Sequence, residues 1–153
     1  MVQEHDYPVS IRWTGDAQLR TESPDHLPEL FVRSPPEFGG EPNVWSPEHL
    51  FVASVASCFV TTLLAIAGIS KLEIRALEVP AVGTLERGDD RFYSIPRIEL
   101  QPQVTLAREK DRDRLERLLA KADNNCLISR SVRSQVTLKP TITVEPSGTA
   151  EAA

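Results

Sequence analysis

Two cysteines are the residues of this chain whose chemistry is least easily explained by packing alone. Cys58 lies inside the apolar stretch SPEHLFVASVASCF, and Cys126 lies in NCLISRSV, sixty-eight positions later. Free cysteine is among the most buried residue types, so the simplest interpretation of Cys58 is a space-filling role. Two thiols can also act in redox chemistry, because a sulfenic acid on one condenses with the other to a disulfide. Sequence spacing alone does not show whether the two sulfur atoms meet.

A reactive Cys58 has to be ionised near neutral pH. A free thiol has a pKa of about 8.5, and apolar surroundings raise the pKa further. Cys58 lies in the middle of a predicted helix, so the positive N-terminal end of that helix is too distant to stabilise a thiolate. A nearby cation, itself held in place by an acidic group, is therefore the expected source of stabilisation.

The helix that carries Cys58 has clear start and stop signals. Ser46 is a favoured N-cap residue, Pro47 suits the first helical position, and Glu48 complements the positive helix end. Gly68 is the expected residue just beyond the end of the helix. The sequence therefore predicts a helix from Pro47 to about Ala67.

This helix has no charged side chain from Leu50 to Ala67. A helix that is apolar on all sides must be covered on all sides in a soluble protein. A membrane span is not expected, because serine and threonine interrupt the apolar run and no basic flank or aromatic belt brackets it. A partner subunit is the expected source of part of the cover.

Glu48 precedes Cys58 by ten positions on the predicted helix. This spacing corresponds to about 15 Å along the helix axis and places the two side chains on different faces. Within one subunit, Glu48 is therefore not expected to contact Cys58. If both residues belong to one site, two chains must contribute to it; otherwise Glu48 is simply an acidic residue that complements the helix dipole.

The rest of the chain predicts strands and one further helix. TESPDHLP is expected to form a turn, and SPPEFGGEPNVW a loop that leads into the first helix. Residues 108–125 form an amphipathic helix, and Cys126 begins a short further helical turn. Strands are expected at residues 8–13, 29–34, 72–79, 82–88, 91–106 and 134–146. Pro96 and Pro102 place the strand at 91–106 on a sheet edge or at bends.

Strands joined by short turns alongside a few helices favour an α+β fold with a largely antiparallel sheet. The length of 153 residues suits one domain, expected at residues 1–145, followed by a flexible tail at 146–153. The net charge of −5 argues against a nucleic-acid partner. Two cysteines are too few for a disulfide-stapled secreted scaffold, and no signal peptide precedes the first strand, so a cytoplasmic location is expected.

Zinc is not expected either, because its ligands would have to come from two widely spaced cysteines and the scattered histidines His5, His26 and His49. A cysteine hydrolase would need a histidine as its base. His49, however, lies nine positions before Cys58 and nearly opposite it on the helix. No metal or organic cofactor is predicted.

The motifs PPEFGG, SPEHLFVASVASCF and NNCLISRS, in this order and spacing, resemble those of the OsmC/Ohr family (osmotically inducible protein C and organic hydroperoxide resistance protein). The resemblance spans the chain from about Trp13 to Val144. It implies an OsmC-like fold, with mostly antiparallel sheets packed on two long central helices in an intertwined homodimer. It also implies thiol-dependent reduction of hydroperoxides in oxidative-stress defence.

The resemblance implies a role for each cysteine. Cys58 matches the peroxide-attacking cysteine, which becomes a sulfenic acid, and Cys126 matches the resolving cysteine. An external dithiol would then reduce the disulfide. Among the apolar residues near the thiol, Leu50, Phe51, Val55 and Phe59 either admit an apolar hydroperoxide tail or pack in the core. The alternative function is a stress protein or small-molecule binding protein that keeps the fold with little peroxidase turnover.

The resemblance also implies that Glu48 pairs with an arginine near the reactive sulfur, across the subunit interface. The turn that carries this arginine in the Ohr branch corresponds to TGDA at residues 14–17, which contains none. Arg20 is the expected local substitute, with Arg12 and Arg33 as alternatives. Leu127 stands where a proline often follows the second cysteine, so the chain is expected in the broader OsmC-like group.

Overall fold

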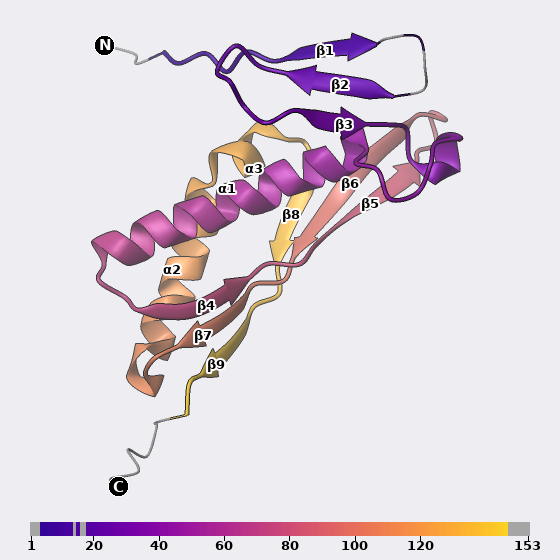
Figure 1. The fold of residues 1–153 in the computed structure, drawn as a ribbon. Coiled ribbons are helices and arrows are strands. Elements are labelled where there is room, and N and C mark those ends of the chain that lie inside the picture. Colours follow the sequence, from indigo (N-terminus) through magenta and orange to yellow (C-terminus); the bar gives the residue numbers. More distant parts are fainter. Residues whose placement is uncertain (1–3, 14, 16–17, 147–153) are drawn as a thin grey trace, which may run out of the picture. The chain divides into compact units, whose positions relative to one another are not determined.

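The computed structural model describes residues 4–13, 15 and 18–146 (Figure 1). The chain divides into two compact units, Met1–Phe51 and Val52–Ala153, with the boundary inside helix α1 (Pro47–Ile69). The single domain expected at 1–145 stays a prediction. The tail expected at 146–153 lies, apart from Pro146, outside the described residues.

The first unit contains an antiparallel sheet with the order β1-β2-β3, made of β1 (Ser10–Trp13), β2 (Leu19–Glu22) and β3 (Leu30–Val32). Strand β2 was not predicted, because its alternation is short and Thr21 had been assigned to a turn. The Thr21 side chain reinforces the pairing with β3: its hydroxyl donates to the Leu30 carbonyl at 2.8 Å and accepts from the Leu30 amide at 3.1 Å.

The PPEFGG motif forms a tight connection after β3. The 3₁₀ helix η1 (Pro36–Phe38) ends at Gly39, whose φ of 81° is a left-handed conformation that favours glycine. A Cβ atom at Gly40 would lie 1.5 Å from the carbonyl oxygen of Ser34, so no other residue fits there. Both glycines of the motif therefore have a backbone role.

The predicted start of α1 is confirmed. The amide of His49 donates to Ser46 Oγ at 3.2 Å, which is the N-cap arrangement, and Ser46 Oγ also lies 2.7 Å from His49 Nδ1. Ser46 has no exposed surface. The segment before the helix is fixed to β3, because the Arg33 amide donates to the Trp45 carbonyl at 2.9 Å.

The predicted end of α1 is wrong by a few residues. The helix continues through Gly68 to Ile69, and the left-handed residue beyond it is Lys71, with a φ of 54°. The amide of Leu72 donates to the Ala67 carbonyl at 2.9 Å, and the amide of Lys71 to the Gly68 carbonyl at 3.1 Å. This is a Schellman ending, in which buried Leu72 supplies the usual apolar contact. Because this left-handed position holds a lysine in place of the usual glycine, the end of the helix is not recognisable in the sequence.

The second unit contains two three-stranded sheets, with the orders β4-β7-β9 and β5-β6-β8. The strands are β4 (Ile74–Glu78), β5 (Ala81–Arg87), β6 (Tyr93–Leu100), β7 (Gln103–Leu106), β8 (Gln135–Leu138) and β9 (Thr141–Val144). Pairs β4–β7 and β5–β6 are antiparallel, while β6–β8 and β7–β9 are parallel. The sheets are therefore mixed.

Prolines divide three long strand segments where the chain passes from one sheet to the other. Pro80 separates β4 from β5, Pro102 separates β6 from β7, and Pro140 separates β8 from β9. The three breaks lie beside one another, because the Gln101 amide donates to the Pro80 carbonyl at 2.8 Å and the Thr141 amide to the Pro102 carbonyl at 2.7 Å. The single strands expected at 91–106 and 134–146 are therefore each two strands.

Pro96 lies in β6, which is the central strand of its sheet, so of the two predicted positions, an edge or a bend, the edge is wrong. The pairing of β5 with β6 shifts register between Thr84 and Glu86, and the pairing of β6 with β8 begins only at Arg97. Pro96 is therefore accommodated at an irregularity in the ladder, where its missing N–H costs no regular hydrogen bond.

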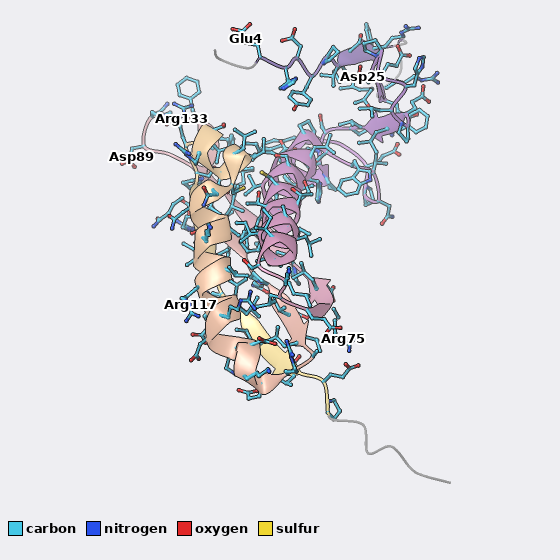
Figure 2. The ribbon with its side chains drawn as sticks, turned by 90° about the vertical axis from the view of Figure 1, so that its left-hand side faces the viewer. Glu4, Asp25, Arg75, Asp89, Arg117 and Arg133 are labelled. Atoms are coloured by element: carbon cyan, nitrogen blue, oxygen red, sulfur yellow. The ribbon has the colours of Figure 1, made fainter. Side chains whose placement is uncertain are left out.

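Helices α1 and α2 supply apolar stripes to the core of the second unit. α2 (Arg112–Asn125) follows the 3₁₀ helix η2 (Glu109–Asp111) and is followed by α3 (Leu127–Ser131). The fully or nearly buried residues are Val55, Phe59, Leu63, Ala67, Ile98, Leu100, Val104, Leu106, Leu115, Leu118, Leu119 and Ala122. Arg117 projects from the outer, polar side of α2 (Figure 2). The predicted α+β class and the amphipathic α2 are confirmed.

Only one stripe of α1 is covered. Its buried residues recur every fourth position from Val55 to Ala67, while Leu64 is 48% exposed and Ile69 is 85% exposed. The helix has a mean hydropathy of 2.3 over its most apolar window, and 22% of that window is buried, so by length and composition it could also cross a membrane. Much of an apolar helix is therefore left without cover from the described part of its own chain.

Candidate thiol site

The structure brings the two cysteines together in the second unit. Cys58 is half-buried on α1, and Cys126 lies fully buried between α2 and α3. The Cys126 thiol donates to the Val55 carbonyl oxygen at 4.0 Å, and the Ile128 amide, two residues after Cys126, donates to Cys58 Sγ at 3.5 Å. Both cysteines are free thiols. The two thiols are therefore neighbours within one unit, which their spacing in the sequence does not show.

A break in the backbone at Cys126 creates this arrangement. Cys126 has φ −64° and ψ 110°, an extended conformation that ends α2 and starts α3 in a new direction. The first hydrogen bond within α3 runs from the Arg130 amide to the Cys126 carbonyl, at 3.1 Å. The earlier amides of α3 have no partner inside the helix. One of them, the Ile128 amide, donates to Cys58 Sγ at 3.5 Å.

The pKa of Cys58 lies below that of an ordinary cysteine. Partial burial is the largest single influence and raises the pKa, but four hydrogen bonds together outweigh it. In decreasing order, the donors are the Ile128 amide, the Cys126 thiol, the Thr62 hydroxyl and the Leu127 amide. All four are neutral groups of the second unit, and the cation that is expected across the subunit interface stays a prediction.

The pKa of Cys126 is shifted in the opposite direction. Burial raises it most, and the neighbouring Cys58 sulfur raises it further, since two adjacent thiolates repel each other. The hydroxyl and amide of Ser129 lower the pKa of Cys126, but by less than burial raises it. Ser129 Oγ has no hydrogen-bond partner of normal geometry among the described residues. At neutral pH, Cys58 is therefore the better nucleophile and Cys126 stays protonated.

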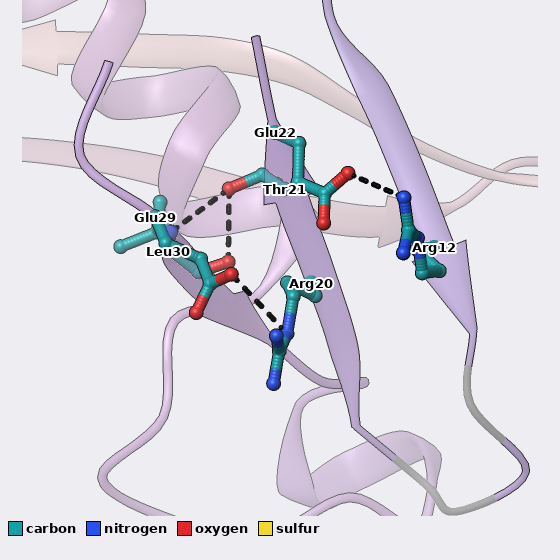
Figure 3. Close-up of polar contacts among 6 residues, drawn as sticks. All are labelled: Arg12, Arg20, Thr21, Glu22, Glu29 and Leu30. Carbon is teal, nitrogen blue, oxygen red and sulfur yellow. Dashed lines mark hydrogen bonds and ion pairs between the residues drawn. The ribbon is translucent and has the colours of Figure 1, made fainter. Parts of the chain in front are cut away.

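Arg20 and Arg12 belong to the first unit and have partners there (Figure 3). Arg20 Nε lies 3.3 Å from Glu29, and its guanidinium lies 5.6 Å from the centroid of the Phe31 ring. Arg12 donates to Glu22 at 2.9 Å. Both arginines are substantially exposed. Arg20 is the expected substitute for an arginine in the turn TGDA at residues 14–17. Apart from Gly15, this turn lies outside the described residues, and the role of Arg20 stays a prediction.

Arg33 and Glu48 also belong to the first unit. Each of them has a buried polar side-chain atom. The Arg33 side chain is only 17% exposed, and its guanidinium pairs with Glu41. Arg33 Nε and Glu48 Oε2 are both buried, and neither has a hydrogen-bond partner among the residues that the structure defines. Buried charged groups are normally paired, so both atoms point to a contact that the described chain does not supply.

Two of the predicted apolar residues lie in the core of the second unit, and His49 belongs to the first unit. Val55 and Phe59 have no exposed surface and belong to the core, which confirms the packing interpretation for these two. His49 is bound to Ser46 in the helix cap of the first unit. Among the described residues, no group of three or more histidine, cysteine or acidic side chains could hold a metal ion.

Sequence reasoning missed Thr62 and the amides of α3. The spacing of four residues between Cys58 and Thr62 was a usable signal, because such residues lie on the same face of a helix. The amides of Leu127 and Ile128 carried no such signal, since their position depends on the backbone break at Cys126 and on how α3 packs against α1.

Comparison with known proteins gives one consistent family. The model of the OsmC-like protein family matches residues 40–141. The uncharacterized protein YmaD of Bacillus subtilis is 24% identical over 150 residues, which cover 95% of this chain and 98% of YmaD.

Solved structures show the same fold. An OsmC-like protein of unknown function from Vibrio cholerae matches with a TM-score of 0.83 and 20% identity, over 90% of this chain and 100% of that one. An organic hydroperoxide resistance protein from Elizabethkingia anophelis matches with a TM-score of 0.70 and 22% identity, over 94% and 100% of the two chains. Identities this low establish the fold alone.

The opposite pKa shifts predict that iodoacetamide alkylates Cys58 before Cys126 at about pH 7, because only the thiolate is the nucleophile. Peptide mapping by mass spectrometry after a limited reaction measures the two yields. The Cys58→Ser variant serves as a control and should alkylate slowly at Cys126. Equal labelling of both thiols in the native protein would contradict the assigned pKa directions.

Proposed function

The chain belongs to the OsmC/Ohr family, and on this premise we propose that it is a thiol-dependent peroxidase that reduces organic hydroperoxides. Family membership and the likeness to organic hydroperoxide resistance proteins support a role in peroxide stress. The observation that carries the finer proposal is the proximity of two free thiols: Cys126 lies 4.0 Å from the Val55 carbonyl oxygen, one helical turn before Cys58, and the Ile128 amide donates to Cys58 Sγ at 3.5 Å.

In the first step, the Cys58 thiolate attacks the terminal oxygen of the hydroperoxide. The S–O bond forms with the sulfur electron pair while the O–O bond breaks, which leaves a sulfenic acid on Cys58 and an alkoxide that takes a proton to become the alcohol. Sulfur is oxidised by two electrons and the peroxide is reduced by two.

In the second step, Cys126 attacks the sulfenic sulfur. The S–S bond forms, and hydroxide leaves with the Cys126 proton as water. An external dithiol then exchanges with this disulfide, so that its own two thiols become a disulfide and both protein thiols are restored. A reducing, cytoplasmic setting that maintains such a dithiol is part of the proposal.

A buried arginine is proposed to stabilise the departing alkoxide, since a positive charge placed where negative charge develops lowers the barrier. Arg20 is the candidate from the sequence. Arg33 is favoured by a specific observation, because its Nε and the Glu48 Oε2 atom are buried with no partner in the described chain. An Arg33–Glu48 pair completed in the assembled protein would satisfy both atoms.

The assembled protein is proposed to be an intertwined homodimer. α1 leaves apolar residues such as Leu64 uncovered, and the β1–β3 sheet exposes Ile11 by 56% and Trp13 by 67%. A second copy could cover such surfaces, and it would also let Glu48 of one chain and Cys58 of the other share a site, given their expected separation of about 15 Å along one helix.

We expect sedimentation velocity to show a stable dimer at micromolar concentration in the absence of lipid or detergent. The apolar α1 surface then lies between the subunits. A compact monomer would contradict the shared site, and partition of the intact protein into liposomes in place of dimer formation would instead favour α1 as a membrane segment.

Intact mass spectrometry after one equivalent of cumene hydroperoxide tests the reaction directly. We expect a loss of about 2 Da, for one disulfide, and no loss in Cys58→Ser. In Cys126→Ser, Cys58 should gain about 16 or 32 Da as the sulfenic or sulfinic acid. An unchanged mass with both thiols free would contradict the peroxidase and favour the small-molecule binding protein.

The same assay, followed over time, compares the arginines. Arg33→Gln is expected to slow disulfide formation by about tenfold or more, as loss of an oxyanion-stabilising group does. Arg75→Gln is the matched control, because Arg75 is not among the candidate arginines and is an exposed residue paired with Glu73 and Glu145 on the surface. If Arg20→Gln slows disulfide formation and Arg33→Gln does not, Arg20 is the arginine that stabilises the departing alkoxide.

A further inference from the structure

The loop after β3 folds back on itself and returns to the end of that strand. The amide of Gly40 donates to the Pro35 carbonyl at 3.1 Å. The backbone of Gly40 also lies so close to the Ser34 carbonyl oxygen that a side chain has no room there. This return brings Glu41 beside Arg33, eight positions earlier in the chain, and the two side chains form an ion pair.

Arg33 is held at two points of the first unit. Its backbone amide donates to the Trp45 carbonyl at 2.9 Å, and its Nη1 atom pairs with the Glu41 carboxylate. A guanidinium is planar and carries five N–H donors in fixed directions, so an ion pair at one nitrogen sets the direction of the others. Arg33 Nε is buried and has no hydrogen-bond partner among the described residues. The nitrogen that is left for a further contact is therefore already oriented by the first unit.

The exposure of Glu41 indicates what its ion pair contributes. The Glu41 side chain is 66% exposed, whereas that of Arg33 is 17% exposed. Water therefore screens most of the Glu41 charge, and the guanidinium keeps its positive charge toward other partners. An ion pair with one exposed member also adds little to the stability of the fold. What remains for Glu41 to supply is the orientation of the Arg33 guanidinium.

We propose that Glu41 is a positioning residue, which fixes the Arg33 guanidinium so that its remaining donors face the oxygen on which negative charge develops. This inference rests on the proposed function, in which Arg33 stabilises the departing alkoxide. No atom of Glu41 takes part in the bond changes. Its effect arises because such a donor must lie about 2.7–3.1 Å from the oxyanion to stabilise it, so that a guanidinium free to turn loses part of its effect.

The choice of oxidant separates a positioning role from a merely structural one. tert-Butyl hydroperoxide releases an alkoxide, a strong base that gains much from a nearby positive charge. Peracetic acid releases acetate, a weak base that gains little. A misaligned Arg33 therefore slows the reaction with the hydroperoxide far more than the reaction with the peracid, whereas a disturbed fold slows both reactions alike.

The test measures the rate of disulfide formation by the reduced full-length protein with each oxidant, by rapid quenching and mass spectrometry. With tert-butyl hydroperoxide, Glu41→Gln should react about three- to tenfold more slowly than the native protein, which is part of the effect of losing an oxyanion donor. With peracetic acid, its rate should stay within about twofold of the native rate. Glu41→Asp should restore part of the loss, because it keeps the carboxylate. Glu37→Gln is the matched control and should react like the native protein, because Glu37 is an exposed acidic residue of the same loop.

The double variant shows whether Glu41 acts through Arg33. In the Arg33→Gln background, Glu41→Gln should cause no further loss with tert-butyl hydroperoxide, because the effects of residues that act as a unit are not additive. An unchanged rate in Glu41→Gln, an equal loss with both oxidants, or additive losses in the double variant would overturn the inference.

The outcomes also separate this inference from the proposed function. A native protein that forms no disulfide with either oxidant contradicts the peroxidase, and the positioning role falls with it. A native protein that reacts, with Glu41→Gln reacting equally fast, overturns the positioning role alone. If Arg20→Gln slows the reaction and Arg33→Gln does not, Arg33 does not act on the alkoxide, and the role of Glu41 is excluded while the peroxidase stands.

Discussion

The sulfur of Cys58 accepts a hydrogen bond from the Ile128 amide at the start of α3, and the geometry of the site depends on this contact. The contact requires Cys126 to be extended between two helices, because a continuous helix would use the amide of Ile128 internally. One backbone break therefore places a buried thiol and free amides beside the same sulfur. It also explains why two cysteines of the same type differ in pKa.

Packing within the rest of the second unit fixes the position of α1. α1 packs closely on β5, since a Cβ atom at Gly83 would lie 2.4 Å from a methyl group of Val52. The aligned breaks at Pro80, Pro102 and Pro140 let the same long segments take part in two sheets. The fold thus fixes the helix that carries Cys58, while the connection after α2 carries Cys126.

The sequence predicted the helices well, because their signals are local. The Ser46 cap, the uncharged run after Leu50 and the leucine stripe of α2 all act within a few residues. Predictions failed where non-local pairing decides: part of β2 was assigned to a turn. For Pro96 the sequence left an edge or a bend open, and the irregular pairing of β5 with β6 agrees with the bend. Motif spacing identified the two cysteines, but their contact depends on packing between distant elements.

The electrostatic expectation concerns residues on both sides of a subunit interface. A cation is expected beside Cys58 because apolar burial raises the pKa of a thiol and the N-terminus of α1 is too distant to lower it. The structure shows neutral donors, whereas Arg33 and Glu48 carry the buried atoms without partners in the described chain. The arginine expected beside Cys58 from the partner subunit therefore stays a prediction.

The central claim is that the two reacting sulfur atoms belong to one chain. Protein labelled with ¹⁵N and unlabelled protein can be mixed, allowed to exchange subunits, oxidised with an alkyl hydroperoxide, and digested without reduction. The account predicts linked Cys58–Cys126 peptides in which both halves are labelled or both are unlabelled. Linked peptides that combine one labelled and one unlabelled half, or the absence of any Cys58–Cys126 link, would contradict it.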